Sequence, residues 1–312
     1  MRAAGAGPCS LGLPARRGPP NYASGVDTTT LNADAASTDP SASTPPTKAV
    51  ILARGLGTRM RRADDSAQLD EKQAQMAASG VKALIDVGRP FLDYVISVLA
   101  DAGITEVCLV IGPEHDALRE YAAAISGGRV QVTTAVQEEP RGTADAVAAA
   151  REFAGADRVV VLNSDNYYPL ESLRALVAAP GNALVGFDRA ALVERSNIPA
   201  DRIAAFALVD TDEAGHLTDI VEKPDAATLA AYGQDAPVSM NAWLFTPAVF
   251  DACDRVEPSS RGELEIIDAV RTLASEGHPV TVVPAAVGVL DMSSRGDVAA
   301  VQQALAGVEV VL

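Results

Sequence analysis

A glycine-spaced, basic turn near residue 55 has the residue types that bind phosphate. It follows residues 49–53, a short apolar run typical of a strand buried on both faces of a parallel sheet. Gly55 and Gly57 lack a Cβ, so backbone N–H groups there can come close to a ligand. Arg59 adds a fixed positive charge. Both features suit a triphosphate, so we predict that this edge of a sheet binds the phosphates of a nucleotide.

Two common glycine loops do not fit this turn. The pattern GxGxxG would need a glycine at Met60, and the pattern GxxxxGK[ST] has no match here. An ordinary strand and turn with incidental glycines is the alternative interpretation, and further motifs must decide against it.

A carboxylate follows a second predicted strand. Residues 159–162 are apolar, and Asp165 comes shortly after them. Ligands of an open α/β sheet bind beyond the carboxyl ends of its strands, and Mg²⁺ prefers oxygen ligands. The competing role for Asp165 is an N-cap of the helix expected from Leu170, but Asp165 lies too far upstream and Pro169 intervenes. We therefore predict that Asp165 is a metal ligand.

The turn resembles the opening motif of the sugar-1-phosphate nucleotidyltransferases, or nucleotide-sugar pyrophosphorylases, in particular their glucose-1-phosphate thymidylyl and adenylyl branches. Their motif L-A-small-G-x-G-T-R-M/L corresponds to LARGLGTRM here, and Arg54 stands at the small position. An arginine there could reach the triphosphate or narrow the base pocket. The resemblance runs from Lys48 to the end of the chain through motifs in the family's order. The nucleotide-binding residues that it implies in this turn are Ala53, Gly55, Gly57, Thr58 and Arg59.

Two more stretches extend the nucleotide side of this resemblance. GVKALIDVGRP, at residues 80–90, is similar to the family's P-K-x-L-x-x-V-x-x-x-P, with Val81 in place of the proline. QEEPRGTA, at residues 137–144, is similar to the loop that borders the base. The nucleotide-binding residues that these stretches imply are Lys82, Gln137, Pro140 and Gly142.

Three later stretches imply the sugar-phosphate and metal sites. NSDN resembles the family's GDN with Ser164 for glycine, EKP at residues 222–224 matches directly, and RGELEIID at residues 261–268 resembles the thymidylyl branch. Leu290 stands near the family's usual tryptophan, and the asparagine–glycine pattern expected around residue 241 is absent. The implied sugar-phosphate ligands are Asn166, Glu222, Lys223 and Asn241. The implied metal ligands are Asp165 and Asp291, with Mg²⁺ as the cofactor.

The reaction that the resemblance implies converts an NTP and a sugar-1-phosphate to an NDP-sugar and pyrophosphate by in-line attack at the α-phosphate. The sugar would be glucose or a related sugar or cyclitol. A phosphate monoester has its second pKa at about 6, so the attacking oxygen needs no general base. The reaction needs positioning and charge neutralisation instead. The implied catalytic residues are Arg59 and Lys82 at the leaving pyrophosphate, Asp165 at the metal, and Lys223 at the attacking phosphate.

The base is the least determined feature. The Gln–Pro–Gly loop and RGELEI favour dTTP or UTP, whereas GTADAV at residues 142–147 resembles the adenylyl branch. The amide of Gln137 can face a base in either orientation, so it excludes neither. An adenylyl- or guanylyl-transferring member of the family is therefore the alternative. A catalytically inactive, nucleotide-sugar-sensing domain is the alternative of another class.

Strands alternate with helices after Lys48, which predicts βαβ units in a mainly parallel sheet with helices on both faces. This agrees with the α/β fold that the resemblance implies, a three-layer Rossmann-like sheet with a smaller sugar-binding β portion. Strands are expected at residues 107–111, 130–134, 159–162 and 183–187, and helices at 90–102, 114–125, 144–153 and 170–178. Beyond Asp188 we expect a hairpin of residues 203–210 and 216–221, a strand at 238–245, and helices at 264–274 and 298–305.

Residues 1–47 differ in composition from the rest of the chain. They are rich in Ala, Gly, Pro, Ser and Thr and lack periodicity, which predicts a disordered N-terminal tail. A transit peptide or an over-extended start are the alternatives. Residues 48–312 would form the nucleotidyltransferase domain, with a nucleotide half at about 48–187 and a sugar-phosphate half at about 188–312. No appended β-helix is expected, because the chain ends at Leu312, soon after Asp291.

The net charge and the cysteines indicate which partners and which cellular compartment to expect. The net charge of −16 disfavours nucleic acid and anionic lipid, so we expect neither nucleic acid nor a membrane as a partner. The expected partners are the NTP and the sugar-1-phosphate, with a homo-oligomer possible. Cys9, Cys108 and Cys253 show no metal-type spacing and no disulfide framework, so a cytoplasmic location is expected.

Overall fold

The structure is a computed structural model that describes residues 45–64, 67 and 69–312. The predicted disordered tail, residues 1–47, lies outside the described residues except for positions 45–47. None of the described helices combines the length and the apolar character that crossing a membrane requires.

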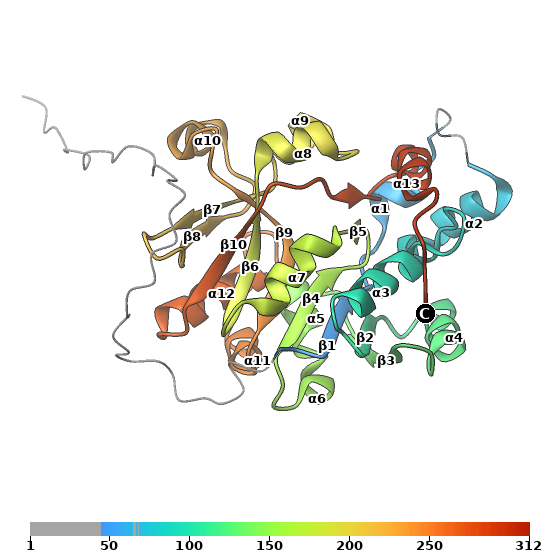
Figure 1. Cartoon of the computed structure of the whole chain (residues 1–312), viewed down its shortest axis with the longest axis horizontal. Helices are drawn as coiled ribbons and strands as arrows, with labels where there is room; N and C mark the ends of the chain where they lie inside the picture. The colour runs from blue at the N-terminus through green and yellow to red at the C-terminus, as the bar shows by residue number, and fades with distance from the viewer. Residues whose placement is uncertain (1–44, 65–66, 68) are drawn as a thin grey trace, which may run out of the picture. The chain divides into compact units, whose positions relative to one another are not determined.

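A mainly parallel sheet forms the centre of the described chain (Figure 1). Its main strands are β1 (Lys48–Leu52), β2 (Glu106–Ile111), β3 (Gln131–Val136), β4 (Val159–Asn163), β6 (Asn182–Phe187), β9 (Val238–Phe245) and β10 (Val280–Ala285). β1 pairs in parallel with β2 and β4, β2 pairs with β3, and β10 pairs with β6. β9 runs antiparallel between β4 and β6, which gives the order β10-β6-β9-β4-β1-β2-β3.

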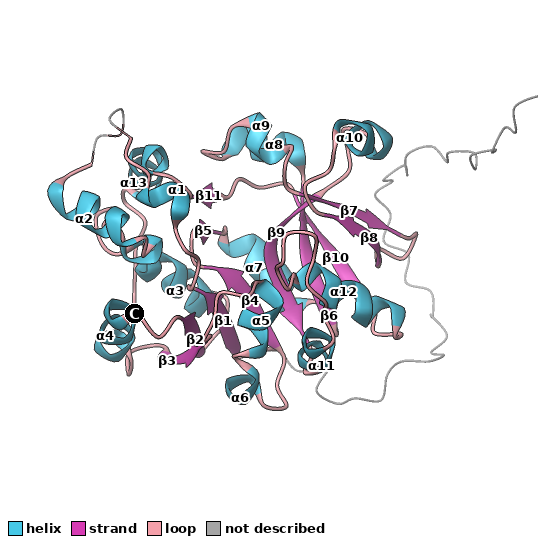
Figure 2. Cartoon of the chain, turned by 180° about the vertical axis from the view of Figure 1, so that it is seen from behind, coloured by secondary structure: helices cyan, strands magenta, loops and turns pink. Residues whose placement is uncertain are grey.

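Helices cover both faces of this sheet, which confirms the predicted α/β fold (Figure 2). Side chains of β1 alternate between two apolar clusters, because Ala49 and Ile51 pack into one and Val50 into the other. The first cluster includes residues of α3 (Phe91–Asp101) and α7 (Leu170–Ala178). The second cluster includes residues of α5 (Thr143–Ala148), α11 (Ala248–Asp254) and α12 (Ile266–Ser275).

The predicted hairpin exists, but its first strand begins later than expected. β7 (Ala207–Thr211) pairs antiparallel with β8 (Leu217–Val221), and β7 also joins the edge of β9. The prediction of a strand from residue 203 is wrong, because the short helix α9 (Ala200–Ile203) follows Pro199. A short apolar run fits a helix or a strand equally well, and a proline favours a helical turn directly after it.

Two further elements differ from the prediction. The predicted helix at residues 144–153 is wrong as a single element, because α5 ends at Ala148 and a separate α6 (Arg151–Ala154) follows. The missed β10 carries Pro284, which an edge strand tolerates. The helices not yet named are α1 (Thr58–Arg61), α2 (Glu71–Ser79), η2 (Lys82–Leu84), α4 (Asp116–Ile125), α8 (Arg189–Arg195), α10 (Ala226–Tyr232), η3 (Arg295–Asp297) and α13 (Val298–Leu305).

A two-strand sheet brings distant parts of the chain together beside the carboxyl end of β4. β5 (Asn166–Tyr167) pairs antiparallel with β11 (Leu290–Asp291), so that Asp291 lies opposite Asn166. The backbone N–H of Met292 donates to the backbone oxygen of Asp165 at 2.9 Å. This pairing positions the second predicted metal carboxylate next to the first.

Candidate active site

A cavity of about 520 Å³ lies where β1, β3 and β4 end. Its walls come from the glycine turn after β1, from η2, and from the loops after β3 and β4. Every residue that the sequence predicted at the nucleotide contributes to these walls. They are Ala53, Gly55, Gly57, Thr58, Arg59, Lys82, Gln137, Pro140 and Gly142, and the predicted metal ligand Asp165 lines the same cavity.

Gly57, more than Gly55, determines the conformation of the glycine turn. Gly57 has φ = 60°, and a Cβ on it would lie 2.4 Å from the backbone oxygen of Gly80. A Cβ on Gly55 would meet nothing within 4 Å. Gly57 therefore allows the segment that leads to Lys82 to pack against the turn.

Arg54, at the position where the family has a small residue, is buried in the wall of the cavity. Its Nη2 lies 3.4 Å from Glu114 Oε2, while Nε and Nη1 make no hydrogen bond with any described residue. A guanidinium normally satisfies its donors when it is buried. Arg54 thus holds unpaired donors at the cavity wall.

The loop after β3 is fixed by the segment that carries the RGELEI motif. Leu264 exchanges two backbone hydrogen bonds with this loop, donating to Arg141 at 2.7 Å and accepting from Ala144 at 2.9 Å. Gly142 has φ = 131°, and a Cβ on it would lie 2.3 Å from the backbone oxygen of Leu264. The two motifs that favoured a pyrimidine in the sequence are therefore in direct contact.

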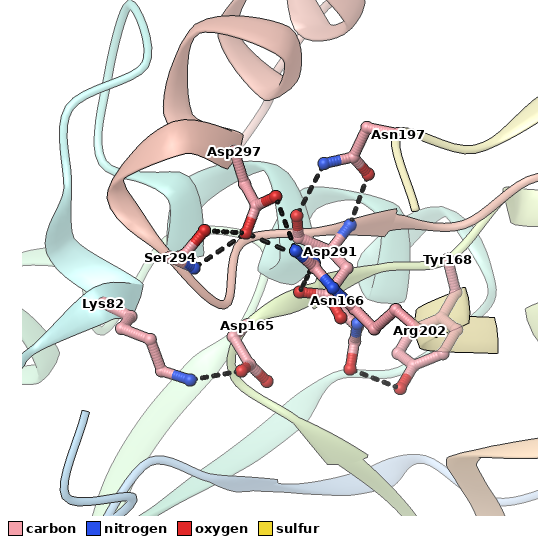
Figure 3. A network of polar contacts seen from close by, with 9 residues as sticks. All are labelled: Lys82, Asp165, Asn166, Tyr168, Asn197, Arg202, Asp291, Ser294 and Asp297. Carbon is pink, nitrogen blue, oxygen red and sulfur yellow. Dashed lines mark hydrogen bonds and ion pairs between the residues drawn. The ribbon is translucent and has the colours of Figure 1, made fainter. Parts of the chain in front are cut away.

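The two predicted metal carboxylates lie near each other at the β5–β11 pairing, where Asp291 is opposite Asn166 and the Asp165 side chain is directed at Lys82 (Figure 3). Asp165 forms an ion pair with Lys82, and both side chains are largely buried. Burial, and next the negative charge of Asp165, raise the pKa of Asp291 to about 6, against a hydrogen bond from Ser293. Asp291 Oδ1 is buried and has no hydrogen bond from any described residue.

These observations fit a divalent cation. Asp291 Oδ1 accepts no hydrogen bond from the described residues and has Arg202 at 3.6 Å as a charged neighbour, so this buried oxygen next to a second carboxylate can still ligate a cation. The described residues contain no group of three or more His, Cys, Asp or Glu side chains that could enclose a metal ion. Mg²⁺ does not need such a group, because it commonly uses one or two carboxylates together with substrate phosphates and water.

Two residues that the sequence did not indicate hold Asp291 in place. Asn197 accepts from the backbone N–H of Asp291 at 2.8 Å and donates to its backbone oxygen at 2.7 Å. Arg202, in α9, lies 3.6 Å from Asp291 Oδ1 and also pairs with Asp297 (Figure 3). No sequence signal marks them, because they lie between α8 and the predicted strand at residues 203–210, in a stretch without a recognised motif.

The predicted sugar-phosphate residues do not line this cavity. Asn166, Glu222, Lys223 and Asn241 all lie outside its walls. However, Lys223 (φ = 47°) and Asn241 (φ = 59°) are the non-glycine residues with positive φ in the described chain. Strained backbone of this kind clusters at functional sites, where the surrounding structure must enforce it. Burial raises the pKa of the Glu222 carboxyl, opposed by the charge of Arg261.

Comparison with known proteins gives one family. The model of the family described as "Nucleotidyl transferase" matches residues 48–287. The chain is 34% identical to the low-salt glycan biosynthesis nucleotidyltransferase Agl11 of Haloferax volcanii over 241 residues. The aligned region covers 75% of this chain and 58% of that protein. The chain is 30% identical over 240 residues to a glucose-1-phosphate thymidylyltransferase of Streptomyces griseus, covering 75% of this chain and 59% of that protein.

The fold also matches a solved structure. A UDP-glucose pyrophosphorylase complexed with UDP-glucose superposes with a TM-score of 0.65 at 15% identity, covering 84% of this chain and 98% of that one. At this identity the match concerns the fold alone. The chain spans less than two thirds of the length of the two curated relatives named above.

Proposed function

The chain belongs to the nucleotidyl transferase family, and on that basis we propose that it joins an NTP to a sugar-1-phosphate, yielding an NDP-sugar and pyrophosphate. The observation that carries the proposal is the cavity at the carboxyl ends of β1, β3 and β4. Its walls include a glycine turn, the cations Arg54, Arg59 and Lys82, and the carboxylate of Asp165. That set provides for a triphosphate and for a metal ion beside it.

The glycine turn and η2 would receive the triphosphate. Backbone N–H groups at Gly55 and Thr58 would approach the phosphates, while Ala53, whose own N–H donates to the backbone oxygen of Val110, would contribute only to the wall beside them. Gly57 supports this arrangement by letting residue 80 pack closely against the turn. Arg59 and Lys82 would neutralise charge that develops on the leaving pyrophosphate. Gln137, Pro140 and Gly142 would border the base.

The chemistry would need no proton transfer from the protein. An oxygen of the sugar phosphate attacks the α-phosphorus, the bond from that phosphorus to the bridging oxygen breaks, and pyrophosphate leaves with the electron pair. None of the three histidines, all of which are described, lines the cavity. Asp165 and Asp291 would hold Mg²⁺, which supplies positive charge between the two approaching phosphates when bound. Lys82, which is paired with Asp165 in the structure, would then leave Asp165 to the metal and contact a phosphate.

The sugar phosphate would lie on the other side of Asp165. Lys223 would hold the attacking phosphate, and Asn166, Glu222 and Asn241 would contact the sugar. The positive φ at Lys223 and Asn241 supports this assignment, because the fold maintains an unfavourable backbone at both positions.

We propose dTTP or UTP as the nucleotide and glucose-1-phosphate, or a related sugar or cyclitol phosphate, as the acceptor. The contact between the base loop and RGELEI supports the pyrimidine, as does the curated thymidylyltransferase relative. We further propose a cytoplasmic location, because Cys108 and Cys253 are buried free thiols. Association into a homo-oligomer is part of the same proposal.

A direct assay tests the function. The full chain is mixed with Mg²⁺, glucose-1-phosphate and each of dTTP, UTP, ATP and GTP, and pyrophosphate release is followed. We expect release with dTTP or UTP to be fastest. A faster rate with ATP or GTP would overturn the base assignment, and no release with any of a panel of sugar and cyclitol phosphates would overturn the reaction itself.

A further inference from the structure

Arg54 carries hydrogen-bond donors that the rest of the described chain does not satisfy. Its side chain is 7% exposed, and its Nε and Nη1 have no hydrogen-bond partner among the described residues. Buried donors of this kind are normally paired, because an unpaired one lowers stability. A small residue, which is usual at this position of the family motif, would avoid that cost. The buried arginine therefore needs an explanation other than the stability of the fold.

One weak contact holds the guanidinium of Arg54 in its place. Nη2 lies 3.4 Å from Glu114 Oε2, whereas a strong charge-assisted hydrogen bond measures about 2.7–2.9 Å. The Glu114 side chain is 51% exposed, so solvent screens the pair. Protein atoms cover Nε and Nη1, and a ligand reaches them only after the guanidinium turns. Little resists this movement, because the guanidinium leaves only one half-exposed carboxylate.

Arg54 lies on the side of the cavity where the nucleoside is expected. The sheet order places β1 between β4 and β2, with β3 beyond β2. Asp165 follows β4, whereas Glu114, the contact of Arg54, follows β2, and Gln137 follows β3. The guanidinium is thus directed away from the metal carboxylate and toward the loop that would border the base. It can only donate, so its partner on a ligand is an acceptor atom.

We propose that Arg54 is a nucleotide-binding residue that turns from Glu114 into the cavity and donates hydrogen bonds to the nucleoside part of a bound NTP. The proposal rests on the proposed function, in that it takes this cavity to bind an NTP. The acceptor is a base carbonyl or a ribose hydroxyl. The bound nucleotide satisfies donors that the chain alone leaves unpaired, so the same side chain that weakens the fold strengthens binding.

The main test is Arg54→Met, which keeps a long side chain and makes this part of the wall apolar. Dissociation constants of UTP, ATP, GTP, their 2′-deoxy forms and tripolyphosphate are measured by calorimetry with the full chain and Mg²⁺, without any sugar phosphate. We expect the tightest-binding NTP to bind about tenfold more weakly in the variant, and tripolyphosphate less than about twofold more weakly. An equal loss for the deoxy form identifies the base as the partner, and a smaller loss identifies the 2′-hydroxyl.

The melting temperature provides a second readout that a structural role would move in the opposite direction. Without nucleotide, Arg54→Met should melt about 2–4 °C higher than the unchanged protein, because it removes a buried and incompletely paired charge. The tightest-binding NTP should raise the melting temperature of the variant less than that of the unchanged protein. If Arg54 only supported the fold, the variant would melt lower and keep its nucleotide affinity.

Two further variants are controls for this measurement. Arg62→Met removes a nearby positive charge from an exposed residue that lines no part of the cavity, so NTP affinity should change less than about twofold. Glu114→Gln weakens the contact of Arg54 and leaves its donors in place, so the NTP should bind at least as tightly as before. A tenfold loss in Glu114→Gln, or equal losses in Arg54→Met and Arg62→Met, would overturn the inference.

The outcomes separate this inference from the proposed function. Unchanged NTP affinity in a folded Arg54→Met, or equal losses for NTP and tripolyphosphate, would overturn the inference. If that variant does not fold, Arg54→Lys decides, because it keeps the charge and loses the planar set of donors, and unchanged NTP affinity in it would overturn the inference. A chain that binds NTP through Arg54 but releases no pyrophosphate with any acceptor would leave the inference standing and remove the proposed function. Pyrophosphate release by a chain whose Arg54→Met variant keeps full NTP affinity would do the reverse.

Discussion

The nucleotide cavity and the carboxylate region around Asp291 are built in different ways. Most of the cavity wall is formed by short stretches that directly follow parallel strands, such as residues 53–59 after β1 and the loop of Gln137, Pro140 and Gly142 after β3. Asp291 instead depends on contacts with β5 and with the segment that carries Asn197 and Arg202, two parts of the chain that are distant from it in sequence. The comparison teaches that a site on strand ends can be recognised from local patterns, whereas a site assembled from distant segments cannot.

The largest effect is expected where the two regions meet. Asp165→Asn or Asp291→Asn keeps the size of the side chain and removes a charge that would hold Mg²⁺. We expect turnover to fall by about 100-fold or more in each variant. Calorimetric titration with Mn²⁺ should show weaker binding in both, which separates loss of the metal from loss of the fold. Near-normal turnover at limiting Mg²⁺ in both variants would show that the carboxylates do not form one site.

The cavity side of the comparison can be tested at Gln137. Gln137→Ala removes the amide and leaves a base edge unpaired, which should cost about 1–3 kcal/mol in kcat/KM for the preferred nucleotide. KM for the sugar phosphate should change little, because Gln137 borders the other part of the site. Equal losses for both substrates would mean that the loop supports the whole site and not the base alone.

Which features could be predicted from the sequence depends on how far apart along the chain the contacting residues are. Local rules were sufficient for β9, α7 and α13, and for the walls at Gly57, Lys82 and Gln137. They failed at residues 203–206, where the start of an apolar run is the end of α9 and a turn, and at Arg202, whose importance comes from carboxylates about 90 positions further along the chain. Asp145 was visible within GTADAV, but its hydrogen bond to Gln137 depends on how the loop closes.

Two glycines in one turn offer a smaller, purely structural test. Gly57→Ala places a Cβ at φ = 60° and 2.4 Å from the backbone oxygen of Gly80. We expect a loss of about 1–2 kcal/mol in the free energy of unfolding, which lowers the melting temperature by a few degrees. Gly55→Ala meets nothing within 4 Å and should melt close to the unchanged protein. Equal shifts in both variants would show that the contact with residue 80 does not shape the turn.

The smallest effect is expected at Arg202, and its sign tells how the carboxylate region works. Arg202→Gln removes a positive charge 3.6 Å from Asp291 Oδ1, while Asn197 still holds the backbone of Asp291 through two hydrogen bonds. Repulsion between Arg202 and a bound cation should therefore matter more than its help in positioning. We expect Mn²⁺ to bind about three- to tenfold more tightly, with a slightly lower melting temperature.

Arg255→Gln is the control for that measurement, because it removes an exposed pair with Glu276 far along the chain from Asp291. Mn²⁺ affinity should not change in it. Weaker binding in Arg202→Gln would mean that the ion pair positions the carboxylate and that Asn197 alone is not enough. In that case α9 would be an essential support of the metal site, and the carboxylate region would depend even more on distant segments than the nucleotide cavity does.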